Sequence, residues 1–375
     1  MRVLLVFGTR PEAIKMAPVY REMRKRSDQF ECKVCATAQH REMLDSVLDL
    51  FTIRPDYDLD IMAPSQSLER VAAEVFQRLP EVLSAEKPDC VLVQGDTTSA
   101  MAAALCAYYQ RIAVGHVEAG LRSGNVYSPF PEEINRRVVS HVAQYHFAPT
   151  ERARQNLMHE GIAADRVVVT GNTVIDALLE AAAKARQIAA PPAAAAARLA
   201  WGEKRVVLIT GHRRESFGEP LRRVCSAFRQ LSRRNPDVEF FYPVHLNPEV
   251  REPVRAMLSG IDNFHLVEPL DYLSFVWCMD RCYLIITDSG GIQEEGPSLG
   301  KPVLVTRDVT ERSEGIEAGT AKLVGADAER IIGETQSLLD SRDKYEAMSR
   351  AVNPYGDGHA AERIADFLAT QAIRK

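Results

Sequence analysis

The chain has 375 residues, a length typical of two domains rather than one. Its 46% hydrophobic and 26% charged residues are those of an ordinary globular protein, and a formal net charge of −5 argues against a non-specific electrostatic grip on nucleic acid. No run approaches the ~20 apolar residues of a membrane span, and the first apolar run is too short for a signal-peptide core. We therefore expect a cytoplasmic protein with no membrane insertion.

Cysteine usage agrees with that compartment. The chain has seven cysteines, an odd number, in a sequence too long for a disulfide-stapled miniature domain. Cys32 and Cys35 form the only C-x-x-C pair. A redox or zinc pair is the alternative, but no second pair completes a zinc site. We predict that both are strand residues and that the chain holds no metal.

The first half of the chain alternates short apolar runs with stretches of helical periodicity. Strands are predicted at 3–7, 32–37, 90–94, 112–117, 145–148 and 167–170. Helices are predicted at 13–25, 41–50, 68–83, 99–109 and 134–142. This rhythm indicates βαβ units and a parallel sheet.

An alanine-rich stretch at 180–200, around Pro191-Pro192, interrupts the rhythm and is typical of a helix end and a linker. Strands are then predicted at 205–210, 238–243, 264–267, 283–287 and 302–306, with helices at 221–233, 248–258, 272–279, 292–299 and 359–372. Two doubly wound α/β domains are expected to face a cleft. Because such sheets bind ligands beyond the carboxyl ends of their strands, the segments that follow each strand are the candidates.

Three acidic residues of the first half lie in segments that follow two neighbouring strands. Asp96 follows strand 90–94, Glu118 follows strand 112–117, and Glu132 opens the next helix. The alternative for Asp96 is a helix cap, and for Glu132 a partner of the helix dipole. Loops from one sheet edge would nevertheless bring the three carboxylates together, which favours acid–base chemistry.

Groups suited to an anion follow other strands. Arg10 and Lys15 lie near the start of the first helix, where anions are stabilised, although solvated cations are an equal alternative. In the second half, Ser289-Gly290-Gly291 opens a helix without a capping box. Glycines there let backbone N–H groups approach a phosphate. The chain has neither a P-loop nor a GxGxxG motif, so no NAD or ATP site is predicted.

Eight strings, in order along nearly the whole chain, resemble the UDP-N-acetylglucosamine 2-epimerase family: GTRPEAIKMAP (8–18), GDTTSA (95–100), HVEAGLRS (116–123), PFPEEINRR (129–137), TGHRRES (210–216), TDSGGIQEE (287–295), KPVLVTRDVTERSEG (301–315) and NPYGDGHAAERI (353–364). The resemblance implies a GT-B-type fold with two Rossmann-like domains, 1–171 and 172–358, and a C-terminal helix, 359–375, that packs back on the first. It also implies reversible interconversion of UDP-GlcNAc and UDP-ManNAc without a cofactor, through elimination of UDP to 2-acetamidoglucal and re-addition.

The resemblance assigns roles residue by residue. The implied catalytic residues are Asp96, Glu118, Glu132 and His212. The implied substrate-binding residues are Arg10, Lys15, Arg136, Phe275, Ser289, Gly290, Gly291, Glu295 and Arg312. Phe275 is the position that packs on uracil and Glu295 the one that binds ribose hydroxyls, although from the sequence alone Phe275 reads as a helix core residue. Which carboxylate is the acid and which the base stays open.

Residues associated with a second, activating UDP-GlcNAc are implied at Gln39, His40, Gln66, Arg213 and His245. They favour the non-hydrolysing bacterial branch, and the family also suggests a homodimer. Three alternatives stay open: a hydrolysing epimerase that releases ManNAc and UDP, a glycosyltransferase of the same fold, and a non-catalytic UDP-sugar sensor.

Overall fold

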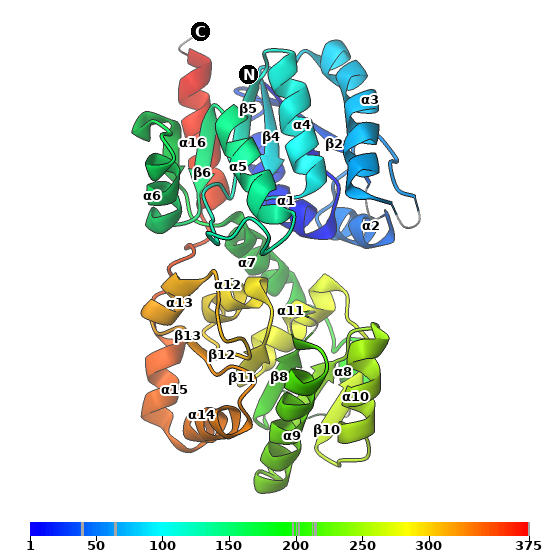
Figure 1. The fold of residues 1–375 in the computed structure, drawn as a ribbon, viewed down its shortest axis with the longest axis vertical. Helices are drawn as coiled ribbons and strands as arrows, with labels where there is room; N and C mark the ends of the chain where they lie inside the picture. The colour runs from blue at the N-terminus through cyan, green and yellow to red at the C-terminus, as the bar shows by residue number, and fades with distance from the viewer. Residues whose placement is uncertain are drawn as a thin grey trace. The chain divides into compact units, whose positions relative to one another are not determined.

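The computed structural model describes the chain except for residues 39–40, 64–65, 197–198, 200, 202, 212, 214–215 and 374–375. It divides into two compact α/β units (Figure 1). The first contains Met1–Ala177 and Tyr355–Lys375, and the second contains Leu178–Pro354.

The first unit contains a seven-stranded parallel sheet in the order β3-β2-β1-β4-β5-β6-β7. The strands are β1 (Arg2–Phe7), β2 (Glu31–Ala36), β3 (Tyr57–Asp58), β4 (Cys90–Gln94), β5 (Ala113–Val117), β6 (Tyr145–Ala148) and β7 (Val167–Val169). The central strand β4 is buried along its whole length, as expected for a parallel strand covered on both faces. The strand order reverses between β1 and β4, the position where doubly wound sheets bind ligands.

Helices cover both faces of this sheet (Figure 1). They are α1 (Arg10–Lys25), α2 (Arg41–Leu50), α3 (Leu68–Glu86), α4 (Thr98–Tyr109), α5 (Glu132–Val142), α6 (Glu151–His159), the 3₁₀ turn Ala164–Arg166, α7 (Thr173–Ala185) and α16 (Ala360–Ile373). Threonine hydroxyls cap two of them: Thr97 accepts the N–H of Ala100, and Thr150 accepts that of Ala153. The last helix, α16, packs Phe367 edge-on against two aromatic rings of β6.

The second unit contains a six-stranded parallel sheet in the order β10-β9-β8-β11-β12-β13. The strands are β8 (Val206–Thr210), β9 (Glu239–Pro243), β10 (Phe264–Val267), β11 (Leu284–Thr287), β12 (Val303–Val305) and β13 (Ala321–Leu323). The helices are α8 (Pro192–Ala196), α9 (Glu219–Arg234), α10 (Pro248–Leu258), α11 (Tyr272–Arg281), α12 (Gly290–Ser298), α13 (Ser313–Glu317), α14 (Ala328–Asp340) and α15 (Arg342–Ser349). Its core includes the stacked rings of Phe240 and Phe264.

Two doubly wound parallel sheets confirm the predicted α/β class. The sequence did not predict the short edge strands β3 and β13, nor the helices α6, α7, α8, α13, α14 and α15. The alanine-rich stretch 180–200, expected to be a helix end and a linker, contains the end of α7 and the short helix α8. Alanine has the highest helix propensity, so much of this composition is helical.

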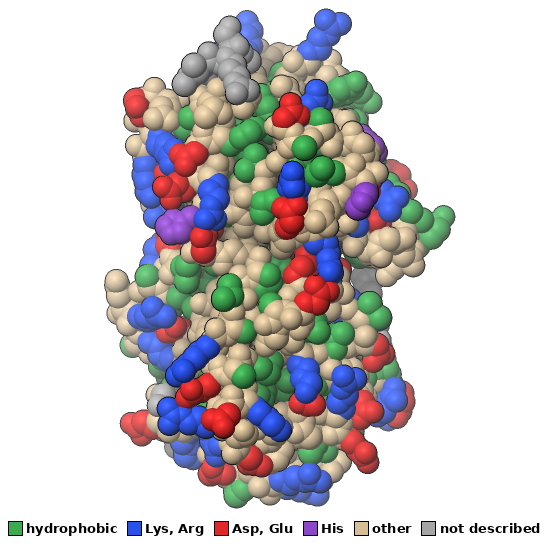
Figure 2. Space-filling model, turned by 90° about the vertical axis from the view of Figure 1, so that its left-hand side faces the viewer, with side chains coloured by type: hydrophobic (Ala, Val, Ile, Leu, Met, Phe, Trp, Pro, Cys, Tyr) green, Lys and Arg blue, Asp and Glu red, His purple; other side chains and the backbone are tan. Residues whose placement is uncertain are grey.

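Three further features of the described structure can be compared with the expectations from composition: the surface charges, the cysteines and the lengths of the apolar helices. Positive and negative side chains are interspersed over the face shown in Figure 2. All seven cysteines are buried free thiols, and Cys32 and Cys35 lie on β2, where burial raises the pKa of each thiol to about 12. Among the helices of the described residues, none is long and apolar enough to cross a membrane.

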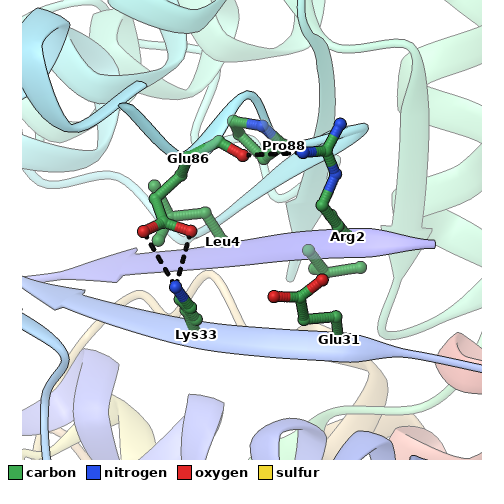
Figure 3. A pocket seen from close by; sticks show the side chains of 7 residues that line it. Arg2, Leu4, Glu31, Lys33, Glu86 and Pro88 are labelled. Atoms are coloured by element: carbon green, nitrogen blue, oxygen red, sulfur yellow. Dashed lines mark hydrogen bonds and ion pairs between the residues drawn. The ribbon is translucent and has the colours of Figure 1, made fainter. Parts of the chain in front are cut away.

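A small pocket lies where β1 and β2 begin, at the sheet edge opposite the carboxyl ends (Figure 3). Glu86 closes it, accepting a hydrogen bond from Lys33 Nζ at 2.9 Å, while the Glu86 carbonyl accepts one from Arg2 at 3.2 Å. The pocket's volume of about 10 Å³ is at the lower limit for holding one water molecule. We therefore regard it as a packing feature of the sheet edge.

Candidate active site

Glu118, directly after β5, accepts hydrogen bonds on both of its carboxylate oxygens. It is 7% exposed and has a left-handed backbone, φ 64°. Lys15 Nζ donates to both of its oxygens at 2.7 Å, and Asn172 Nδ2 donates to Oε1 at 2.9 Å. Gln94 Nε2, at the end of β4, donates to Oε2. These donors favour an ionised carboxylate, and a left-handed non-glycine residue is a costly conformation that often marks a functional site.

The neighbouring turn is held by His116 of β5. Its Nε2 lies 2.7 Å from the carbonyl oxygen of Gly95, which adopts φ 69° to turn the chain towards Asp96. Burial lowers the pKa of His116 to about 3, so the ring is neutral near pH 7. Because a carbonyl only accepts, the single ring proton must lie on Nε2. His116 thus fixes the turn that precedes Asp96.

Asp96 is paired with a cation of α5. Arg136 donates to its Oδ2 from Nε at 2.8 Å and from Nη2 at 2.6 Å. Asn135 Nδ2 donates to the Asp96 carbonyl at 2.8 Å. The start of α5 is therefore fastened to the loop after β4, and Asp96 and Arg136, both expected in the site, are in direct contact.

The two adjacent acids that open α5 differ sharply. Glu133 is fully buried and accepts the N–H of Ser123 at 2.9 Å and Arg137 Nη2 at 3.0 Å. Burial opposes its ionisation, but these bonds prevail and its pKa is lowered. Glu132 is half-buried, and its buried Oε2 has no hydrogen-bond partner among the residues that the structure describes. Glu133 is thus a structural acid, and Glu132 is the one left available to a ligand.

Glu12, to which the sequence analysis gave no role, joins two loops of this site. Its Oε2 accepts the N–H groups of Gly8 and Thr9 at 3.0 and 2.7 Å, and its Oε1 accepts the Thr97 hydroxyl at 2.6 Å. Burial raises its pKa, against these hydrogen bonds. Thr9 and Glu12 have the spacing of a capping box, the signal that would have found it. Arg10, the half-buried first residue of α1, has no side-chain partner within the described part of the chain.

In the second unit, the start of α12 is shaped for close approach. Ser289 precedes the helix, and its N–H donates to Thr287 at 2.9 Å. A Cβ on Gly290 would lie 3.0 Å from the Arg312 guanidinium, whereas a Cβ on Gly291 would meet no described atom outside its own helix within 4 Å. The side of α12 at Gly291 is therefore open, and Arg312 lies against Gly290.

Carboxylates hold Arg312 in place. Its Nε donates to Glu294 at 2.9 Å, and its Nη1 donates to Glu311. Burial opposes ionisation of Glu311, but Arg312 and Arg307 lower its pKa to about 2. Arg312 is therefore a fixed, charged neighbour of the α12 N-terminus, where an anion is stabilised.

The expected nucleoside-binding residues lie on α11 and α12. Glu295 is buried and accepts the Tyr272 hydroxyl at 3.4 Å. Phe275 is a half-buried residue of α11. Both lie within one or two turns of the N-terminus of their own helix. Glu295 is on α12 with the two glycines, and Phe275 is on α11.

Three expected residues lie outside the described part of the chain: Gln39 and His40, expected to bind an activator, and His212, expected to be catalytic. Gln66, in the first unit, donates to the carbonyl of Ile61 at 2.5 Å. In the second unit, Arg213 is half-buried, and its N–H donates to Asp288 at 2.9 Å. His245 is exposed, and its Nδ1 accepts the N–H of Asn247 at 3.1 Å.

The structure therefore joins Lys15 to Glu118 and Asp96 to Arg136, and it sets Arg312 against Gly290. Sequence reasoning missed Gln94 and Asn172 as partners of Glu118. The position of each relative to a strand could have marked it as a candidate: Gln94 is the polar last residue of an otherwise apolar strand, and Asn172 follows the strand that ends at Val169.

The comparisons with known proteins agree over the whole chain. A family model described as UDP-N-acetylglucosamine 2-epimerase matches residues 21–369. A relative from Ralstonia nicotianae is 56% identical over 97% of each chain, and the UDP-N-acetylglucosamine 2-epimerase of Escherichia coli K12 is 54% identical over 100% of each. A crystal structure of UDP-GlcNAc 2-epimerase from Neisseria meningitidis bound to UDP-GlcNAc has a TM-score of 0.90 at 50% identity, covering 99% of this chain and 100% of that one.

These matches extend the fold assignment to the GT-B type, with two Rossmann-like domains. They also agree with the eight strings along the sequence, because the matched range contains seven of them and most of their acidic and basic residues. By full-length similarity, the chain belongs to the UDP-N-acetylglucosamine 2-epimerase family.

Proposed function

We propose that the chain is a non-hydrolysing epimerase that interconverts UDP-GlcNAc and UDP-ManNAc at C2 of the sugar. Family membership supports the reaction class, and the names of the relatives supply the substrate. The observation that carries the proposal is the contrast between two carboxylates of the first unit. Glu118 is held by an ammonium and two amides, whereas Glu132 keeps a buried oxygen without a partner among the described residues. Such unlike environments suit one base and one acid.

The chemistry explains why acids and cations are both required. The C2 hydrogen is not adjacent to a carbonyl, so direct deprotonation is prohibitive. When the bond between C1 and the UDP oxygen breaks, positive charge at C1 acidifies the C2 hydrogen. A carboxylate removes that proton, and 2-acetamidoglucal and UDP result. Protonation of C2 on the opposite face and re-addition of UDP at C1 complete the epimerisation.

We assign the acid–base steps to Glu118 and Glu132. Asp96, already neutralised by Arg136, would tune the site, and His212 would serve the departing diphosphate. Lys15, expected near the diphosphate, lies 2.7 Å from both Glu118 oxygens, which places a cation beside the proposed base. No NAD or metal is required by this scheme.

We assign UDP binding in the second unit to the start of α12 and to Arg312, and the family resemblance implies Arg10 and Arg136 as further substrate-binding residues. The open face at Gly291, the N–H groups at the start of α12 and the fixed charge of Arg312 suit a diphosphate that gains charge as it leaves. Glu295 would bind the ribose hydroxyls and Phe275 would pack on uracil.

We further propose that a second UDP-GlcNAc acts as an activator, bound by Gln39, His40, Gln66, Arg213 and His245, and that the protein is a cytoplasmic homodimer. These assignments rest on the family resemblance.

Product analysis tests the proposed function. Purified protein incubated with UDP-GlcNAc, without NAD, should yield UDP-ManNAc at equilibrium and little free ManNAc. Free ManNAc and UDP as the main products would instead establish a hydrolysing enzyme. Sugar transfer to an acceptor with no epimerisation in its absence would establish a glycosyltransferase, and binding without turnover a sensor.

A further inference from the structure

Asn172 has a side chain whose orientation is fixed from both sides. It is 1% exposed and directly precedes α7. Its Oδ1 accepts the N–H of Val174 at 3.2 Å, while its Nδ2 donates to Glu118 Oε1 at 2.9 Å. A backbone N–H can only donate, so Oδ1 must face the helix and Nδ2 must face the carboxylate. Asn172 thus caps α7 and holds Glu118 at the same time.

The backbone of Asn172 meets a second segment of the chain. The chain leaves the first unit inside α7, after Ala177, and returns to it at Tyr355. The N–H of Asn172 donates to the carbonyl of the buried Tyr355 at 2.6 Å. Beside this bond two glycines with positive φ pass closely, since a Cβ on Gly171 would lie 3.2 Å from Gly356 Cα. A side chain on Gly171 would therefore crowd the second segment at this bond.

Two more contacts fasten the same segments. The Asp176 carboxylate accepts the N–H groups of Ala360 and Ala361 at 3.2 and 2.8 Å, at the start of α16. Arg363 donates to the carbonyl of Thr170 at 2.9 Å. We call residues 170–176 and 355–363 the crossover clasp, because the chain passes to the second unit just after 170–176 and returns at the start of 355–363.

We propose that Asn172 is a positioning residue for Glu118 and ties the proposed base to the crossover clasp. The inference rests on the proposed function, in which Glu118 takes part in proton transfer. Lys15 contacts both oxygens of Glu118 and Gln94 contacts Oε2, so the amide of Asn172 supplies a directional donor at Oε1. A displacement of the clasp would reach the carboxylate through the Asn172 side chain.

Two substitutions separate positioning from packing. Asn172→Ala removes the donor and the cap. Asn172→Asp keeps the shape and an equally good cap but turns an oxygen towards Glu118. We expect Asn172→Ala to lower kcat by about 10- to 100-fold, the scale of one hydrogen bond to a charged group, with the Kd for UDP changed by less than about twofold. Asn172→Asp should lower kcat at least as much, whereas a packing role predicts that the isosteric variant is the more active one.

The control and the double variant use the same assay of UDP-ManNAc formation, with Tm measured to confirm folding. Thr150→Ala removes a comparable cap, on α6 of the same unit, and should lower Tm while leaving kcat unchanged. In a Glu118→Gln background, Asn172→Ala should change the residual kcat by less than about threefold. Unchanged kcat in Asn172→Ala, a more active Asn172→Asp, or a full additional loss in the double variant would overturn the inference. Wild-type protein without turnover would contradict the proposed function itself.

Discussion

Replacing Glu118 by glutamine removes the charge of the proposed base and keeps its shape. In the native site, both oxygens accept hydrogen bonds, from Lys15, Asn172 and Gln94. Glutamine has a single accepting oxygen, so its NH₂ group must face one of the two amide donors. The variant therefore loses a hydrogen bond and leaves Lys15 without its anionic partner.

The size of both effects follows from this geometry. Removing one partner of a buried ion pair costs about 3–5 kcal/mol, and we expect about 3 kcal/mol because the Lys15 side chain keeps 16% of its exposure. Loss of an acid–base group lowers kcat by about 10²–10⁴-fold. That loss corresponds to about 3–5 kcal/mol in the activation barrier. Affinity for UDP should be nearly unchanged, because Glu118 is assigned to the sugar and not to the diphosphate.

The assay combines kcat for UDP-ManNAc formation, UDP binding by calorimetry and urea unfolding. Glu239→Gln is the matched control, because Glu239 is also a buried acid paired with a lysine, Lys204 at 2.6 Å, but lies where β9 begins. It should lose stability and keep kcat. Normal turnover with weakened UDP binding in Glu118→Gln would refute the assignment of Glu118 to proton transfer.

Three further predictions use other parts of the molecule. The pKa of His116 is lowered by burial to about 3, so the unfolded state takes up its proton first as the pH falls. The difference in the free energy of unfolding between wild type and His116→Gln should therefore be constant above about pH 6.5 and shrink by about 1.4 kcal/mol per pH unit below it. Urea unfolding measures this difference, and a difference that does not depend on pH would contradict a neutral buried ring. Gly291→Ala adds a methyl group that meets no described atom beyond its own helix, so Tm should stay the same or rise while the affinity for UDP falls. Undiminished affinity in calorimetry would show that the phosphates bind elsewhere. Initial rates should depend sigmoidally on UDP-GlcNAc, and UDP-ManNAc alone should be a poor substrate until UDP-GlcNAc is added, whereas hyperbolic kinetics for both would argue against an activator.

Periodicity and strand-end position predicted much of the fold. The buried parallel strands are continuous apolar runs, and β4 was predicted at its observed bounds, Cys90–Gln94. The edge strands β3 and β13, of two and three residues, are too short to leave a periodic signal. The alanine-rich stretch does contain the expected helix end, since α7 ends at Ala185, but the short helix α8 was not predicted because Pro191-Pro192 suggested a linker.

The candidate site was predicted in part for a related reason. Apolar runs in the sequence predict where strands end, so Asp96 and Glu118 could be predicted as site residues because each follows a strand. Which donors reach them depends on loops distant in sequence, and Asn172 lies 54 residues from Glu118. The family resemblance selected Glu132 and not Glu133, and packing supplies the physical difference, since Glu133 is fully buried and paired with Arg137.

The most direct test of the account is the fate of the C2 hydrogen. Wild-type protein incubated with UDP-GlcNAc in deuterated water, without NAD, should give UDP-ManNAc that carries deuterium at C2, because the proton is lost to a carboxylate and replaced from solvent. Mass spectrometry and proton NMR of the product would measure it. UDP-ManNAc that retains the original hydrogen at C2 would contradict elimination and reprotonation as the mechanism.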